Sequence, residues 1–139
     1  MANDASIHGL TVGLGGGSQS NSTAVGANAL NASNSGQSSA FGYNALTANT
    51  TGRNVGIGTY ALTTNTTGTF NNAFGDSSLY YNTIGSYNTA VGVSALYSNT
   101  TASNNTAVGY QSLYTNTTGA QLAAFGLSLI HISEPTRPY

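Results

Sequence analysis

The stretch Asn105-Thr-Ala-Val-Gly-Tyr-Gln-Ser-Leu-Tyr-Thr-Asn-Thr-Thr-Gly119 holds one copy of a short motif that returns along almost the whole chain. Its centre is a triad, Ala-Val-Gly or Ala-Phe-Gly, which in one copy reads Gly56-Ile-Gly58. Successive closing glycines are 16, 16, 17, 17, 17 and 17 residues apart. A period this short is too small for an independent domain, so each copy is predicted to be one rung of a stack. The closing glycines, predicted to form corners, are Gly26, Gly42, Gly58, Gly75, Gly92, Gly109 and Gly126.

Each complete rung also carries a Leu four residues after the closing Gly, with Ala or Ser directly before that Leu. Further along, a polar sequence such as Asn65-Thr-Thr-Gly68 marks a second corner. Two short apolar segments separated by turns that contain Gly or Asn predict two strands bent at two corners. A single helical turn after the Gly is the alternative. The Leu residues, predicted to form one buried core column, are Leu30, Leu46, Leu62, Leu79, Leu96 and Leu113.

These features predict an all-β protein, a parallel β-solenoid or β-roll with rungs of 16–17 residues. Parallel coils are about 4.8 Å apart, so seven rungs would form a rod on the order of 34 Å long. Gly at the first corner suits a backbone with positive φ, and Asn at the second corner tolerates it too. Stacked Asn side chains can also hydrogen-bond along the rod. The longer rungs begin between Gly58 and Gly75, where Thr69-Phe70 is predicted to accommodate the extra residue.

Both faces of the strand triad are apolar in nearly every rung. Neighbouring strand residues point to opposite faces, so the Ala and the following Val, Ile or Phe cannot both line one interior. A lone solenoid would expose the second set as a stripe, whereas three solenoids packed side by side would cover it. We therefore expect a homotrimer; the alternative is a monomer with an interior wide enough for both sets. The stripe consists of Val25, Phe41, Ile57, Phe74, Val91, Val108 and Phe125.

Composition divides the chain into three parts. Residues 1–20 are predicted to form an N-terminal strand and a Gly-rich turn that cap the stack, residues 21–126 the solenoid repeats, and residues 127–139 a tail. The segment from Leu127 to Arg137 resembles the translated end of a sequencing adapter. This resemblance implies a non-native tail from a metagenomic assembly and a natural chain that is longer. A genuine C-terminal tail is the alternative.

The composition argues against several function classes. Charged residues make up 4% of the chain and there is no Lys, so little is available to neutralise nucleic-acid phosphates. The chain contains no apolar run typical of a membrane span or signal peptide, and membrane insertion is not expected. His8 lies four residues after Asp4, a spacing that defines no catalytic dyad. Without clustered ligands or acid–base pairs we expect no enzyme, no cofactor and no metal site.

Tyr80, Tyr97 and Tyr114 are one rung apart and are predicted to stack as an aromatic ladder. Aromatic faces suit sugar rings, which makes this ladder a candidate glycan site; plain shielding of the rod surface is the alternative. The chain also contains several Asn-x-Ser/Thr triplets. Those at the corners, such as Asn65-Thr-Thr67, are interpreted as ladder residues rather than glycosylation sites.

The repeat from Asn105 to Gly119 resembles those of tail-fibre-like structural proteins of tailed bacteriophages. Gly9-Leu-Thr-Val-Gly13 before a Gly-rich turn is similar to the way such proteins begin, and the resemblance covers residues 7–126. It implies a virion protein made in the host cytoplasm, a non-enzymatic shaft that supports attachment to a host receptor. It also implies a missing C-terminal tip that binds a cell-surface glycan or receptor, and often a self-cleaving C-terminal chaperone domain.

Two other functions remain alternatives. Related Ala-x-Gly repeats occur in the head domains of trimeric autotransporter adhesins, which implies an extracellular or cell-surface adhesin. Those rungs are usually shorter and come with a signal peptide that is not recognised here. An ice-binding solenoid is the second alternative, because regular Thr arrays can order water. The Thr-Thr pairs of this chain lie at predicted corners rather than on a flat strand face, which argues against it.

Overall fold

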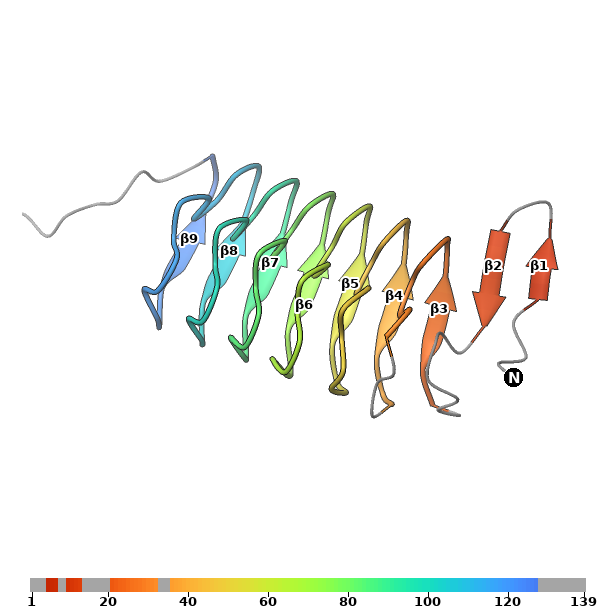
Figure 1. Cartoon of the computed structure of the whole chain (residues 1–139). Helices are drawn as coiled ribbons and strands as arrows, with labels where there is room; N and C mark the ends of the chain where they lie inside the picture. Colours follow the sequence, from red (N-terminus) through yellow and green to blue (C-terminus); the bar gives the residue numbers. More distant parts are fainter. Residues whose placement is uncertain (1–4, 8–9, 14–20, 33–35, 128–139) are drawn as a thin grey trace, which may run out of the picture.

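The computed structural model describes residues 5–7, 10–13, 21–32 and 36–127 of the chain. The strands are β1 (Ala5–Ile7), β2 (Leu10–Gly13), β3 (Thr23–Val25), β4 (Ser39–Phe41), β5 (Val55–Ile57), β6 (Asn72–Phe74), β7 (Thr89–Val91), β8 (Thr106–Val108) and β9 (Ala123–Phe125). They form one nine-stranded sheet in chain order. Figure 1 shows β3 to β9 side by side, with β3 to β8 each followed by a return segment that leads to the next strand. The protein is therefore all-β within the described ranges.

Strands β3 to β9 form the parallel sheet of a β-solenoid. Each strand pairs in parallel with the next, so that Ala73 of β6 lies beside Ala90 of β7, and Ala90 lies beside Ala107 of β8. The closing Gly residues after these strands have φ between 104° and 141°. A side chain is strained at such φ values, whereas Gly adopts them freely. The predicted parallel β-solenoid with rungs of 16–17 residues is confirmed.

The N-terminal strands occupy one edge of the sheet. β2 pairs antiparallel with β3, with Val12 beside Val25 and Gly13 beside Ala24, and β1 pairs antiparallel with β2. The hairpin thus covers backbone groups of the first rung that would otherwise be open to pairing with another chain. The predicted capping strand lies in the same stretch, and residues 14–20 of the Gly-rich turn lie outside the described residues.

The prediction of a second strand in each rung is wrong. After the closing Gly the chain passes through bends and turns, and the part of the chain that the structure describes contains no helical turn either. Three non-Gly residues of each return segment have positive φ, as in Ser77 at 55°, Leu79 at 52° and Tyr87 at 59°. This conformation turns the backbone away from an extended path. Hydrogen bonds between rungs continue here, since the Leu79 N–H donates to the Ala95 carbonyl at 3.0 Å.

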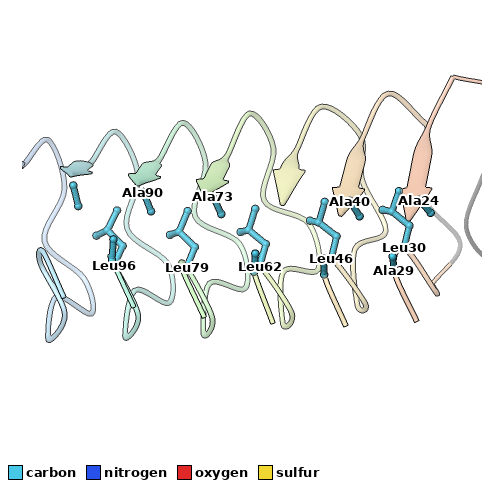
Figure 2. Packing of buried hydrophobic residues seen from close by; sticks show 14 residues of the cluster. Ala24, Ala29, Leu30, Ala40, Leu46, Leu62, Ala73, Leu79, Ala90 and Leu96 are labelled. Carbon is cyan, nitrogen blue, oxygen red and sulfur yellow. The ribbon is translucent and has the colours of Figure 1, made fainter. Parts of the chain in front are cut away.

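The interior is narrow and filled from two sides. The strand Ala side chains are buried, and Figure 2 shows the Leu side chains pointing towards them in a single row along the rod. Leu113 is partly buried, and the five preceding Leu residues of the column are completely buried. The stripe lies on the outside, where Phe74 is 39% exposed and Val91 37%. The alternative prediction, an interior wide enough for both the Ala residues and the stripe, is therefore wrong.

The extra residue of the longer rungs lies before the predicted Thr69-Phe70 pair. In a shorter rung the side-chain amide of Asn49 donates to the Thr51 carbonyl, two residues on. In the next rung the amide of Asn65 donates to the Gly68 carbonyl, three residues on, at 2.9 Å. The insertion is thus within the turn from Asn65 to Gly68. It leaves the phase of the following strand unchanged, which keeps every later side chain on its own face.

Leu79→Ala is expected to lower the free energy of unfolding by about 2–5 kcal/mol, because it removes a fully buried side chain and leaves a cavity between rungs. Leu113→Ala is the matched control and should cost less, since Leu113 is only partly buried near the end of the stack. Urea unfolding followed by circular dichroism measures both. Equal losses at the two positions would contradict a stack in which each rung is held by its neighbours.

Candidate functional site

A ladder of Asn side chains runs along the second corner of the rod. The Asn82 amide donates to Asn65 Oδ1 at 2.7 Å, and the Asn99 amide donates to Asn82 Oδ1 at 2.8 Å. Each amide also closes its own turn, as in the 2.9 Å bond from Asn82 to the Gly85 carbonyl. The predicted bonding along the rod is present, but these Asn residues do not have the positive φ that the sequence suggested. The ladder consists of Asn49, Asn65, Asn82, Asn99 and Asn116.

A second Asn ladder, which was not predicted, lies just before the strands. The Asn71 N–H donates to Asn54 Oδ1 at 2.9 Å, and the Asn88 N–H donates to Asn71 Oδ1 at 3.0 Å. These side chains are completely buried, so the two ladders fill the polar part of the interior. The sequence signal was an Asn four residues before the closing Gly in successive rungs. The ladder consists of Asn54, Asn71, Asn88 and Asn105.

The outer stripe gives the sheet a continuous apolar face. Phe41, Ile57 and Phe74 are 39–40% exposed, and Phe125 in the last described strand is 70% exposed. Val25 and Val108 are half-buried. Because the strands pair in register, these side chains lie one above another along the whole rod. A row of this kind is typical of an interaction surface.

The Tyr ladder stacks as its spacing predicted. The Tyr80 and Tyr97 rings are 5.3 Å apart at an interplanar angle of 19°, and the Tyr97 and Tyr114 rings are 5.0 Å apart at 3°. Both faces of the Tyr97 ring are thus covered by other rings. A sugar ring would need one of those faces, so the geometry favours surface shielding over glycan stacking. Desolvation raises the pKa of Tyr97, and the neighbouring Tyr81 hydroxyl adds to the rise.

The Thr residues of the second corner use their hydroxyl groups within the rod. Thr50 Oγ1 donates to the Thr66 carbonyl at 2.8 Å, and Thr66 Oγ1 donates to the Thr83 carbonyl at 3.0 Å. The pattern continues from Thr83 to Thr100 at 3.0 Å. These hydroxyl hydrogens are bound to the next coil, which leaves them unable to donate to an ordered water layer.

No group of three or more His, Cys, Asp or Glu side chains forms a potential metal site in the described ranges. The same residues contain no helix long and apolar enough to cross a membrane. Asp4 and His8 lie outside the described residues, as does the adapter-like segment apart from Leu127. The chain matches no protein-family model, no curated protein and no solved structure.

Proposed function

We propose that the chain is a non-enzymatic structural shaft of a phage tail fibre or a related virion fibre, made in the host cytoplasm and supporting attachment to a host receptor. The observation that carries the proposal is the unbroken register from β3 to β9, in which every rung repeats the pairing of the one before. Such a stack gains length with each rung while its cross-section stays constant. This is the property that a spacer between a particle and its receptor-binding tip requires.

The two buried Asn ladders support the same proposal. In the first ladder each amide binds both its own turn and the neighbouring coil, as Asn82 does. In the second ladder the side chains of Asn71 and Asn88 bind the neighbouring coil. Adjacent rungs are thus joined by polar contacts of defined direction as well as by apolar packing. Buried polar networks that are fully satisfied specify one arrangement and stiffen it. A rod joined in this way would hold a distal domain at a fixed distance.

The shaft is further proposed to be a homotrimer joined through the apolar stripe, and Phe74→Asp is expected to dissociate it. A carboxylate at this half-exposed position costs little in a monomer but is buried and unpaired in an assembly, at several kcal/mol. Light scattering after size exclusion should show a fall to the mass of one chain, with the β-sheet spectrum retained. Thr101→Asp, on the exposed second corner, is the control and should leave the mass unchanged. A single-chain mass for the unmodified protein would contradict the trimer.

Antibodies against residues 21–126 test the function directly. On particles of a phage that carries the gene they should label the tail fibres in electron micrographs and reduce adsorption to host cells. Labelling confined to a bacterial surface would instead support the adhesin. Thermal hysteresis of the purified rod would support ice binding, against which the engaged Thr hydroxyls argue.

A further inference from the structure

A cavity of about 420 Å³ opens on the side of the rod at the second corner. The cavity is open to solvent rather than enclosed, so a ligand bound in it would keep part of its own surface in water. The lining comes from three successive coils and is polar. It consists of side-chain amide, hydroxyl and guanidinium groups and of the backbone at two glycines. The lining residues are Gly36, Gln37, Thr51, Gly52, Arg53 and Thr69.

Two of the three coils that line the cavity have Gly at the position directly before the residue with positive φ. Gly52 directly precedes Arg53, which has a positive φ of 67°. The next coil has Thr69 at this position, and the last has Ala120. The two coils between them have Ser86 and Ser103, whose hydroxyl groups accept hydrogen bonds from the preceding coil at 3.0 Å. Gly36, in the coil before Arg53, and Gly52, in the same coil as Arg53, carry no hydroxyl group at this position, and both line the cavity.

Arg53 is the only Arg or Lys among the described residues. Its Nε–H donates to Gln37 Oε1 at 2.9 Å, and its guanidinium carbon lies 5.2 Å from the centre of the Phe70 ring. Phe70 in turn stacks on Tyr87, with ring centres 4.9 Å apart and planes 6° apart. These contacts fix the guanidinium plane at the cavity. Within the described ranges no acidic side chain forms an ion pair with it.

We propose that this cavity binds an acidic sugar residue of a polysaccharide, with the sugar carboxylate on Arg53. One guanidinium matches one carboxylate through two parallel hydrogen bonds. The Gln37 side-chain amide nitrogen can donate to a sugar hydroxyl, and the Thr69 hydroxyl can donate or accept. The Thr51 hydroxyl donates to the Gly68 carbonyl at 2.9 Å and can still accept. A single cation and a polar lining fit a singly charged polyol better than a phosphate or a fatty acid. The assignment is independent of the proposed shaft function, since an adhesin could carry the same site.

Titration of the ¹⁵N-labelled full chain with trigalacturonate tests the site. The Arg53 Nε–Hε signal should shift saturably, with a dissociation constant of roughly millimolar order. The chain contains two Arg residues, so the spectrum of Arg53→Gln identifies the signal. A neutral galactose trisaccharide of the same length is expected to bind at least tenfold more weakly. A short Glu peptide, which offers carboxylates without the sugar ring, should also be at least tenfold weaker.

Three variants separate the site from general effects on the fold. Gly52→Ser gives this coil the Ser of two later coils, and should block binding by filling part of the cavity while the charge remains. Arg53→Gln should weaken binding at least tenfold, and Arg53→Lys, which keeps the charge without the planar fork, should be intermediate. Gln121→Asn, at a positive-φ position in the last coil, is the control and should bind normally.

Four results would overturn the proposal. The first two are that the neutral trisaccharide, or the Glu peptide, binds as tightly as trigalacturonate. The third is that Gly52→Ser binds trigalacturonate as tightly as the unmodified chain. The fourth is that the NMR signals that shift belong to residues around Tyr97 instead of Arg53. If Arg53→Gln fails to fold, Gly52→Ser and Arg53→Lys decide the question by themselves.

Discussion

Gly75→Ala is expected to break the stack at its centre, with a loss of at least about 4 kcal/mol in the free energy of unfolding. A Cβ at this position would lie 2.5 Å from the Gly92 carbonyl oxygen and 2.6 Å from its carbon. Both atoms belong to the backbone of the next coil, so relief requires the coils to separate. The φ of 141° adds strain of its own. Urea unfolding followed by circular dichroism measures the loss.

Gly126→Ala is the matched control for this clash. Gly126 also has a positive φ, 104°, but a Cβ there would meet nothing within 4 Å. The variant therefore tests the backbone strain without the contact, and we expect a loss of only about 1–2 kcal/mol, confined to the last rung. Equal losses in the two variants would show that close approach of the coils is not the reason for Gly at this corner.

The sequence predicted the stack because its strongest constraints are periodic. A Gly forced by the close approach of two backbones cannot be replaced, and it therefore marks every coil at the same position. The alternation of Ala inside and Val, Ile or Phe outside follows from strand geometry alone. This alternation placed the stripe outside. The recurrence of Leu at one position of each rung placed the Leu column inside, where Leu62 and Leu79 are completely buried.

The return segment could not be predicted from local preferences. Leu79 has a φ of 52°, a conformation that no propensity of Leu would suggest. Hydrogen bonds to the next coil hold it there, as in the 3.0 Å bond to the Ala95 carbonyl. Contacts between residues 16 or 17 apart thus override the local pattern. The position of the inserted residue was missed for the same reason, since only the bonds of Asn49 and Asn65 reveal it.

The candidate sites, too, could be predicted only as far as regular spacing determines them. Regular spacing was enough to predict that the Tyr rings stack, but not that stacking covers the ring faces a sugar would use. The cavity beside Arg53 is lined by residues of three successive coils, among them Gly36 and Gly52. In the sequence those glycines are ordinary turn residues. Such a site is visible only when coils are aligned in space.

Asn82→Asp is expected to make the stability of the rod strongly dependent on pH. The Asn82 amide donates at 2.7 Å to Asn65 Oδ1 and at 2.9 Å to the Gly85 carbonyl. A carboxylate cannot donate, and it would place negative charge beside both acceptors in a completely buried position. An unpaired buried charge of this kind costs about 3–5 kcal/mol. Melting temperatures across the pH range would measure the effect.

The direction follows from proton linkage. Burial beside two acceptors raises the pKa of the new carboxyl in the folded state above its unfolded value of about 3.9. Below pH ~4 both states are protonated and the ionisation penalty is absent; stability then falls as pH rises from there through the folded pKa. The whole chain has only three Asp and Glu residues, so the stability of the unmodified protein should change little over this pH range.

Asn116→Asp, at the partly buried end of the ladder, is the control and its stability should depend less on pH. A flat pH profile for Asn82→Asp would mean that the ladder does not require an amide at each rung.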